Sequence, residues 1–242
     1  MGPRSDALKA AIDEAWRVFD LPAPTTTGVC EHCCMDPRIE ADFLKRKARD
    51  MPADYVRDWY FAAHADDIRH AHVAWFLPRV MEMLASGEVV ATVGHEVVFQ
   101  RLPRTGFPDR WPARQVDAVN RFALAFFESR IRSADAKGLE DLDSWLCMFG
   151  EGGIDIAPLL NLLDALPDET LAAILDRSWD AGCGGPIRFD AFWSREPART
   201  MAWRWYTSAD LLARMERAAM AGNEAALAVH ALIATARDKD GL

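Results

Sequence analysis

Apolar residues recur every three or four positions through most of this 242-residue sequence, and this spacing constrains the fold more than any other feature. Leu8, Ile12 and Ala15 illustrate it, since residues so spaced share one face of an α-helix. Glycines and prolines, which end helices, separate the periodic segments. No glycine-rich turn joins a strand-like run to a helical one. The pattern excludes dinucleotide-binding and barrel folds in their ordinary form and predicts an all-α protein.

The apolar stripes and end signals place the expected helices along the chain. In the first half they are expected over 8–19, 37–49, 55–63, 68–84 and 112–131. In the second half they are expected over 139–149, 156–165, 168–179, 189–205, 208–220 and 223–236. Pro78 is expected to kink or divide the fourth of these helices, because proline has no amide hydrogen. Asp36, Asp168 and Ser208 are the expected caps at three helix starts.

Residues 88–102 are ambiguous between helix and strand. The valines of this segment favour a strand by propensity, whereas the spacing of Val90, Val93 and Val97 suits a helix. We expect a helix, because the sequence offers no evident partner for a lone strand.

The succession of short amphipathic helices predicts one all-helical domain over residues 1–242. Consecutive short helices are typical of an irregular stack resembling HEAT or armadillo solenoids. A compact multi-helix bundle is the alternative, because no fixed repeat period with recurring residue types is found. The glycines and proline at 182–186 mark a possible internal subdivision.

Composition and charge restrict the classes of partner. Half of the residues are hydrophobic, which excludes a disordered chain, and 28 Lys and Arg against 37 Asp and Glu give a net charge of −9. An acidic chain lacks the positive field that nucleic acids and anionic membranes require. No apolar run is long enough to span a bilayer, and none resembles a signal peptide. We expect a cytoplasmic protein with a protein partner, and the charge favours a basic one.

The densest reactive chemistry lies in residues 30–34, which hold three of the five cysteines. Two thiolates at positions i and i+3 of a turn can hold one zinc ion, and nearby histidines could complete the site. The candidate metal ligands are Cys30, His32, Cys33, Cys34, His64 and His70. Zinc is therefore the one cofactor that the sequence suggests. A purely structural role for the thiols, or a redox role for Cys33 and Cys34, remains an alternative.

Two further clusters are candidate partner-binding sites. Arg101, Arg104, Arg110 and Arg114 form a basic patch with Asp109 as its one opposing charge, and it could receive an acidic partner or a phosphate. The alternative is that these arginines lie on a solvent-exposed loop and have no binding role. The second cluster places Trp203 and Trp205 among arginines, a mixture that is common both in protein interfaces and in ordinary cation–π packing.

Three short motifs resemble those of a group of bacterial proteins for which no activity is established. They are the cysteine loop at 30–34, the Leu-Pro-Arg sequence at Leu77, Pro78 and Arg79, and the Trp-Pro helix start at Trp111. The resemblance covers about the first 135 residues and implies a bacterial, cytosolic, helical-repeat-like protein. It also directs attention to Cys30, Cys33 and Arg79, whose guanidinium could reach free carbonyl groups or an acidic partner.

The sequence contains no catalytic constellation that points to an enzyme. Ser144, Ser178 and Ser194 lack the context of a nucleophile elbow, and acids such as Glu140, Asp141 and Asp143 resemble helix caps. The leading hypothesis is a non-enzymatic scaffold or adaptor that binds another protein, for example as an immunity protein. The alternative is a zinc protein that uses the Cys30 and Cys33 loop for structure or catalysis.

Overall fold

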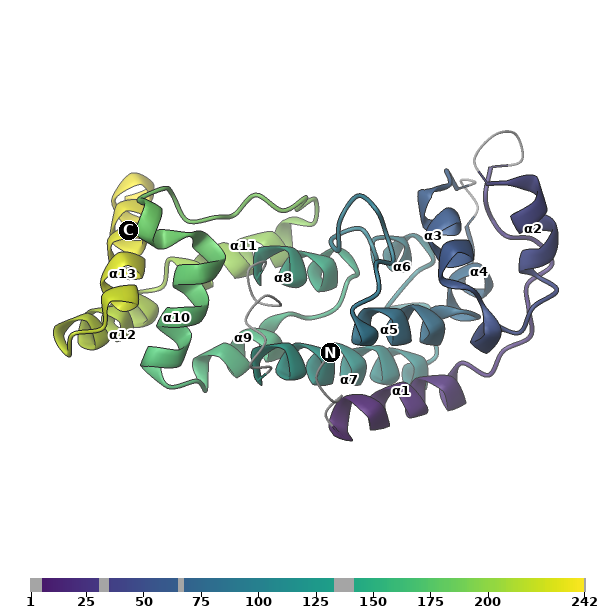
Figure 1. The fold of residues 1–242 in the computed structure, drawn as a ribbon, viewed down its shortest axis with the longest axis horizontal. Coiled ribbons are helices and arrows are strands. Elements are labelled where there is room, and N and C mark those ends of the chain that lie inside the picture. Colours follow the sequence, from purple (N-terminus) through teal and green to yellow (C-terminus); the bar gives the residue numbers. More distant parts are fainter. Residues whose placement is uncertain (1–5, 31–34, 65–67, 133–141, 242) are drawn as a thin grey trace. The chain divides into compact units, whose positions relative to one another are not determined.

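A computed structural model describes residues 6–30, 35–64, 68–132 and 142–241, and it confirms the all-α class (Figure 1). Within these ranges the only β-pairing is an isolated antiparallel bridge between Val29 and His64. The helices of the first half are α1 (Asp6–Val18), α2 (Pro37–Phe43), η1 (Ala48–Asp50), α3 (Ala53–Phe61), α4 (His70–Ala74), α5 (Leu77–Ser86), α6 (Arg101–Arg104) and α7 (Ala113–Arg132). Those of the second half are α8 (Leu142–Glu151), α9 (Ala157–Asp164), α10 (Asp168–Trp179), η3 (Ala181–Cys183), α11 (Glu196–Tyr206), α12 (Ala209–Met220) and α13 (Glu224–Asp240).

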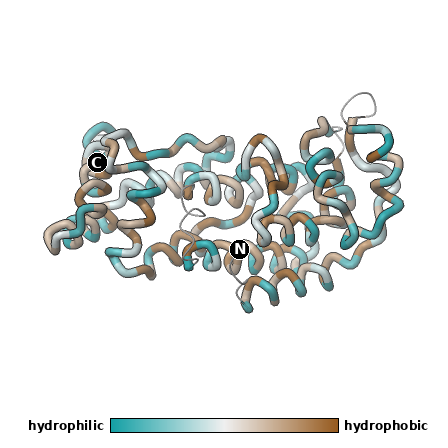
Figure 2. Tube along the Cα trace, in the orientation of Figure 1, coloured by the Kyte–Doolittle hydropathy of each residue, from teal (hydrophilic) through white to brown (hydrophobic). Residues whose placement is uncertain are grey.

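The chain divides into two compact units. Unit 1 comprises Met1–Ser129 and Glu151–Ile154, and unit 2 comprises Arg130–Gly150 and Asp155–Leu242. Hydrophobic and hydrophilic residues alternate along the helices of both units (Figure 2), as expected of amphipathic helices. No helix of the described ranges is both long and apolar enough to cross a membrane. The single-domain and solenoid hypotheses stay predictions.

Aromatic side chains form the centre of unit 1. Trp59 of α3 is fully buried, and its ring meets that of Phe76 edge to face at 4.7 Å between centroids. Phe43 of α2 contacts Phe76 in the same geometry at 5.7 Å. The Trp59 indole N–H also donates to the main-chain oxygen of Thr27 at 2.9 Å. One residue therefore holds the segment before α2 against α3 by both packing and a buried hydrogen bond.

Local end signals set several helix boundaries of unit 1. Asp36 caps α2, accepting from the amide of Arg38 at 2.7 Å, with Pro37 in the first turn, as predicted. The predicted division at Pro78 is also confirmed, because α4 ends at Ala74 and α5 starts at Leu77 with this proline in its first turn.

The prediction of a helix over residues 88–102 is wrong. Residues 88–100 form a series of turns and bends, and only Arg101–Arg104 is helical. The apparent helical stripe fails at Val93, whose side chain is 63% exposed. Gly94 adopts a positive φ of 135°, which an L-residue rarely tolerates and a helix cannot contain. The apolar burial comes instead from adjacent pairs such as Val98 and Phe99.

In unit 2, α10, α12 and α13 pack against one another, and η3 lies against α10 and α13. The predicted helix over 168–179 is confirmed, and Ser208 caps α12 as expected, accepting from the Leu211 amide at 3.1 Å. Asp168 is not a cap. The residue before α10 is Pro167, and Asp168 lies within the first turn.

The predicted helix over 189–205 begins later than expected. The described chain has no helix over 187–195, and α11 starts at Glu196 with Pro197 in its first turn. Proline fits that position because the first helical amides have no intrahelical partner. Asp143 is buried rather than capping, and it accepts from the Ala191 amide at 2.8 Å and the Trp193 indole at 3.0 Å. This carboxylate anchors the irregular segment to α8.

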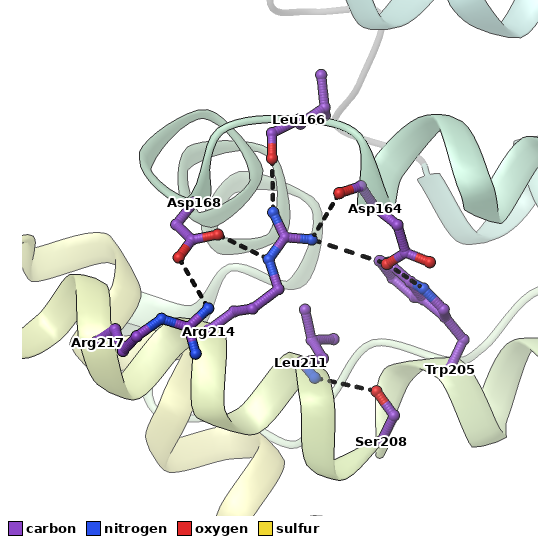
Figure 3. Close-up of polar contacts among 8 residues, drawn as sticks. All are labelled: Asp164, Leu166, Asp168, Trp205, Ser208, Leu211, Arg214 and Arg217. Carbon is purple, nitrogen blue, oxygen red and sulfur yellow. Dashed lines mark hydrogen bonds and ion pairs between the residues drawn. The ribbon is translucent and has the colours of Figure 1, made fainter.

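Arg214 of α12 joins three parts of unit 2 (Figure 3). Its Nε donates to Asp168 Oδ1 at 2.7 Å, and its Nη2 donates to the main-chain oxygen of Leu166 at 2.6 Å. Its Nη1 donates to the main-chain oxygen of Asp164 at 3.1 Å. The guanidinium therefore fixes the connection between α9 and α10 onto α12.

Candidate functional site

The candidate site is a cavity of about 360 Å³ in unit 1, named here the arginine pocket. It lies between the end of α3, the turns before α6, and α6 itself. Its lining residues are Tyr60, Phe61, Ala91, Thr92, Val93, Val97, Gln100, Arg101 and Arg104. The structure thus places two of the predicted partner-binding residues, Arg101 and Arg104, in one pocket.

Among the described residues, the groups that hold Arg101 in place are neutral. Its Nε donates to His64 Nδ1 at 3.1 Å, and its Nη2 donates to the main-chain oxygen of Tyr60 at 2.8 Å. The guanidinium carbon lies 5.0 Å from the ring centroid of Trp59 and 4.9 Å from that of Tyr60. These ring faces provide cation–π attraction in a partly desolvated setting.

The charge of the arginine pocket is not neutralised within the described residues. Arg101 and Arg104 form no ion pair with a carboxylate there, and Nη1 of Arg101 makes no hydrogen bond. Burial lowers the pKa of the Arg101 guanidinium, and the positive charge of Arg104 acts in the same direction. Because a desolvated cation without a counter-ion is costly, an anion is the group that would complete this pocket.

His64 supports Arg101 as a neutral imidazole. Burial, followed by the Arg101 charge, lowers the pKa of His64 from 6.5 to about 3. Its Nδ1 accepts from Arg101, so the proton of the neutral ring is on Nε2, which is buried without a hydrogen-bond partner in the described chain. This tautomer keeps the acceptor aimed at Arg101 over the physiological pH range.

Acidification is expected to destabilise unit 1 through His64. In the unfolded chain His64 takes up a proton near pH 6.5, whereas in the folded chain it does so only near pH 3. The unfolded state therefore binds more protons between these values, and stability falls as the pH is lowered from 6.5 towards 3. Urea titrations at pH 7 and pH 5 measure this loss. The His64→Gln variant should lose less between the two pH values, and an equal loss would contradict the assignment.

The structure tests the geometry of the predicted metal ligands only in part, because His32, Cys33 and Cys34 lie outside the described residues. Cys30 is half-buried, and its amide donates to the main-chain oxygen of Ala63 at 2.8 Å, beside the Val29–His64 bridge. No group of three or more metal-ligating side chains occurs in the described ranges. Zinc binding stays a prediction, and binding by His64 would require Arg101 to release Nδ1.

The remaining predicted site residues lie in other surroundings. His70 hydrogen-bonds through Nε2 to Gln115 at 2.6 Å and meets the Trp111 ring edge to face. The guanidinium of Arg79 donates through Nε to the main-chain oxygen of Met51 at 2.9 Å, so it contacts a carbonyl inside unit 1.

The two predicted partner-binding tryptophans lie in unit 2, on α11. Trp203 lines a second cavity, which is separate from the arginine pocket, and its indole donates to Asp240 at 2.8 Å. The indole of Trp205 donates instead to Asp164 at 2.9 Å, which ties α11 to α9. The sequence therefore grouped two tryptophans whose contacts differ.

Sequence reasoning missed the apolar part of the arginine pocket. Phe61 is 75% exposed at the end of α3, and Val93 is also largely exposed. The expected helix over 88–102 concealed Val93, because it assigned this residue to a buried stripe. Phe61 and Arg101 line the same cavity but lie forty residues apart in the sequence. Their proximity could therefore not be read from the sequence without the fold.

Comparisons with family models, with curated proteins and with solved structures gave no match. The fold and the site define the chain as an all-α protein with a cationic, partly apolar pocket.

Proposed function

We propose that this chain is a non-enzymatic binding protein whose arginine pocket receives an acidic group of a protein partner. The observation that carries the proposal is the pair Arg101 and Arg104, which line one cavity without a carboxylate counter-ion in the described residues. Arginine is well suited to this task, because its planar guanidinium donates two parallel hydrogen bonds to a carboxylate.

The exposed apolar residues favour a peptide segment over a free inorganic anion. Phe61 and Val93 line the same cavity as the two arginines and offer apolar area to a side chain next to the acidic group. An acidic residue beside an apolar residue is therefore the motif that fits this pocket. The net charge of −9 favours a partner whose remaining surface is basic, as in an adaptor or immunity-type role in the bacterial cytoplasm.

Peptide binding tests the proposal directly. Fluorescence anisotropy compares a labelled peptide pool with one Asp or Glu among apolar positions against a matched Asn or Gln pool. The wild-type protein should bind the acidic pool at least about tenfold more tightly, the effect of one charge-assisted pair. Arg104→Glu should remove this preference, because Arg104 is exposed and lines the pocket.

Arg114→Glu provides the matched control. The sequence grouped Arg114 with Arg104 in one basic patch, but the structure places Arg114 on α7, exposed and outside the pocket lining. Its reversal changes the net charge by the same amount. This variant should retain the preference for acidic peptides. No preference in the wild type, or equal losses in the two variants, would overturn the proposal.

A further inference from the structure

Unit 2 contains a second cavity, distinct in chemistry from the arginine pocket. It has a volume of about 530 Å³, within the range of small-molecule sites. It lies beside α11, the segment before α11 and the end of α13. It is named here the aromatic pocket, and the lining residues that matter are Phe189, Glu196, Arg199, Trp203, Arg204 and Asp240.

Two rings line the aromatic pocket, and both are held in place. The centroids of Phe189 and Trp203 lie 5.2 Å apart, with their planes tilted by 42°. Phe189 stacks on Trp193 at 5.6 Å, and the Trp193 indole is in turn bonded to the buried carboxylate of Asp143. The Trp203 indole donates to Asp240 Oδ2 at 2.8 Å. Fixed ring faces of this kind suit a planar aromatic ligand, because stacking then costs little side-chain entropy.

Of the four charged residues named in the aromatic pocket, one arginine and one aspartate have no ion-pair partner among the described residues and can pair with a ligand. Glu196 and Arg199 neutralise each other across 3.0 Å. Arg204 and Asp240 form no ion pair with any described residue, and both are exposed. A ligand that carries both an ammonium and a carboxylate group would complement these two side chains.

We infer that the aromatic pocket binds a small zwitterionic aromatic compound of the aromatic amino acid type. The ring lies against Phe189 and Trp203, the carboxylate pairs with Arg204, and the ammonium pairs with Asp240. This site goes beyond the proposed function, since none of its residues belongs to the arginine pocket.

Three related probes test the inference by isothermal titration calorimetry on the full chain. L-tryptophan carries both charges, tryptamine only the cation, and indole-3-acetate only the anion. L-tryptophan should bind at least about tenfold more tightly than either single-charge probe. Trp203→Ala should weaken all three, whereas Trp203→Phe, which keeps a ring, should weaken them less.

Two substitutions separate the charges. Arg204→Gln should weaken L-tryptophan and indole-3-acetate and spare tryptamine. Asp240→Asn keeps an oxygen that can accept the Trp203 indole N–H, and it should weaken L-tryptophan and tryptamine only. Lys239→Gln and Asp238→Asn, exposed neighbours outside the lining, are the controls and should change nothing. Absence of binding, equal affinities for the three probes, or binding insensitive to Trp203→Ala would overturn the inference.

Discussion

The Arg214→Ala variant is expected to lose about 2–4 kcal/mol of unfolding free energy. This is slightly less than the roughly 3–5 kcal/mol lost when one member of a fully buried charged pair is removed, because the Asp168 carboxylate is partly exposed. The Arg214 side chain is only 14% exposed, and its guanidinium donates to one carboxylate and two main-chain oxygens (Figure 3). Alanine would remove all three donors at once. Urea denaturation followed by circular dichroism measures the loss.

Arg217→Ala is the matched control for this experiment. Arg217 is one turn further along α12 and also reaches Asp168, but its side chain is 63% exposed and the N–O distance is 3.4 Å. Exposed ion pairs of this kind contribute about 0–1 kcal/mol. Arg214→Lys should fall between the two, because lysine keeps the charge without the planar arrangement of donors. A loss for Arg214→Ala no greater than that for Arg217→Ala would contradict the role assigned to Arg214.

Trp59→Ala is expected to destabilise unit 1 by about 3–5 kcal/mol, as for other large-to-small changes of buried aromatic residues. The side chain is fully buried, and its ring contacts Phe76 and His64 at 4.7 Å and 4.3 Å between centroids. The Trp59 ring also packs against the guanidinium of Arg101. The Trp59→Ala protein that remains folded should therefore bind acidic peptides less tightly than the wild type. Thermal and urea denaturation measure the first effect, and peptide anisotropy measures the second.

A pair of tryptophan-to-phenylalanine substitutions isolates the hydrogen-bond contribution. Trp59→Phe removes a donor to the carbonyl of buried Thr27, whereas Trp16→Phe removes a donor to the partly exposed carboxylate of Glu82. The buried acceptor is harder for water to reach, so Trp59→Phe should be the more destabilising change. The reverse order would show that the Thr27 bond is not a main support of this region.

Strong local signals made much of the fold predictable. The α10 helix and the caps at Asp36 and Ser208 follow from periodicity and from side chains that bond to amides two or three residues away. The prediction of a helix over 88–102 failed because a three- and four-residue spacing of valines can also occur by chance in a series of turns. Periodicity reports burial only when the backbone is already helical.

The candidate sites were less predictable, for a physical reason. The sequence grouped Arg101 with Arg104, but the acceptors that position Arg101 include main-chain oxygens about forty residues earlier, which carry no residue-type signal. The same holds for Arg214, two of whose acceptors are carbonyls at the end of α9 and in the turn after it. Long-range bonds to the main chain are invisible in a single sequence.

The proposed binding of an acidic group at Arg101 would link the stability of unit 1 to the anion that is bound. Among the described residues, carbonyls and an imidazole hold this cation, and none of them supplies a counter-ion. An anion that binds only the folded state adds RT ln(1 + [L]/Kd), about 2.7 kcal/mol at one hundred times Kd. If the proposed acidic partner binds the arginine pocket, the protein should resist unfolding and proteolysis better with this partner than alone, and the abundance of the partner would then set how long the protein survives.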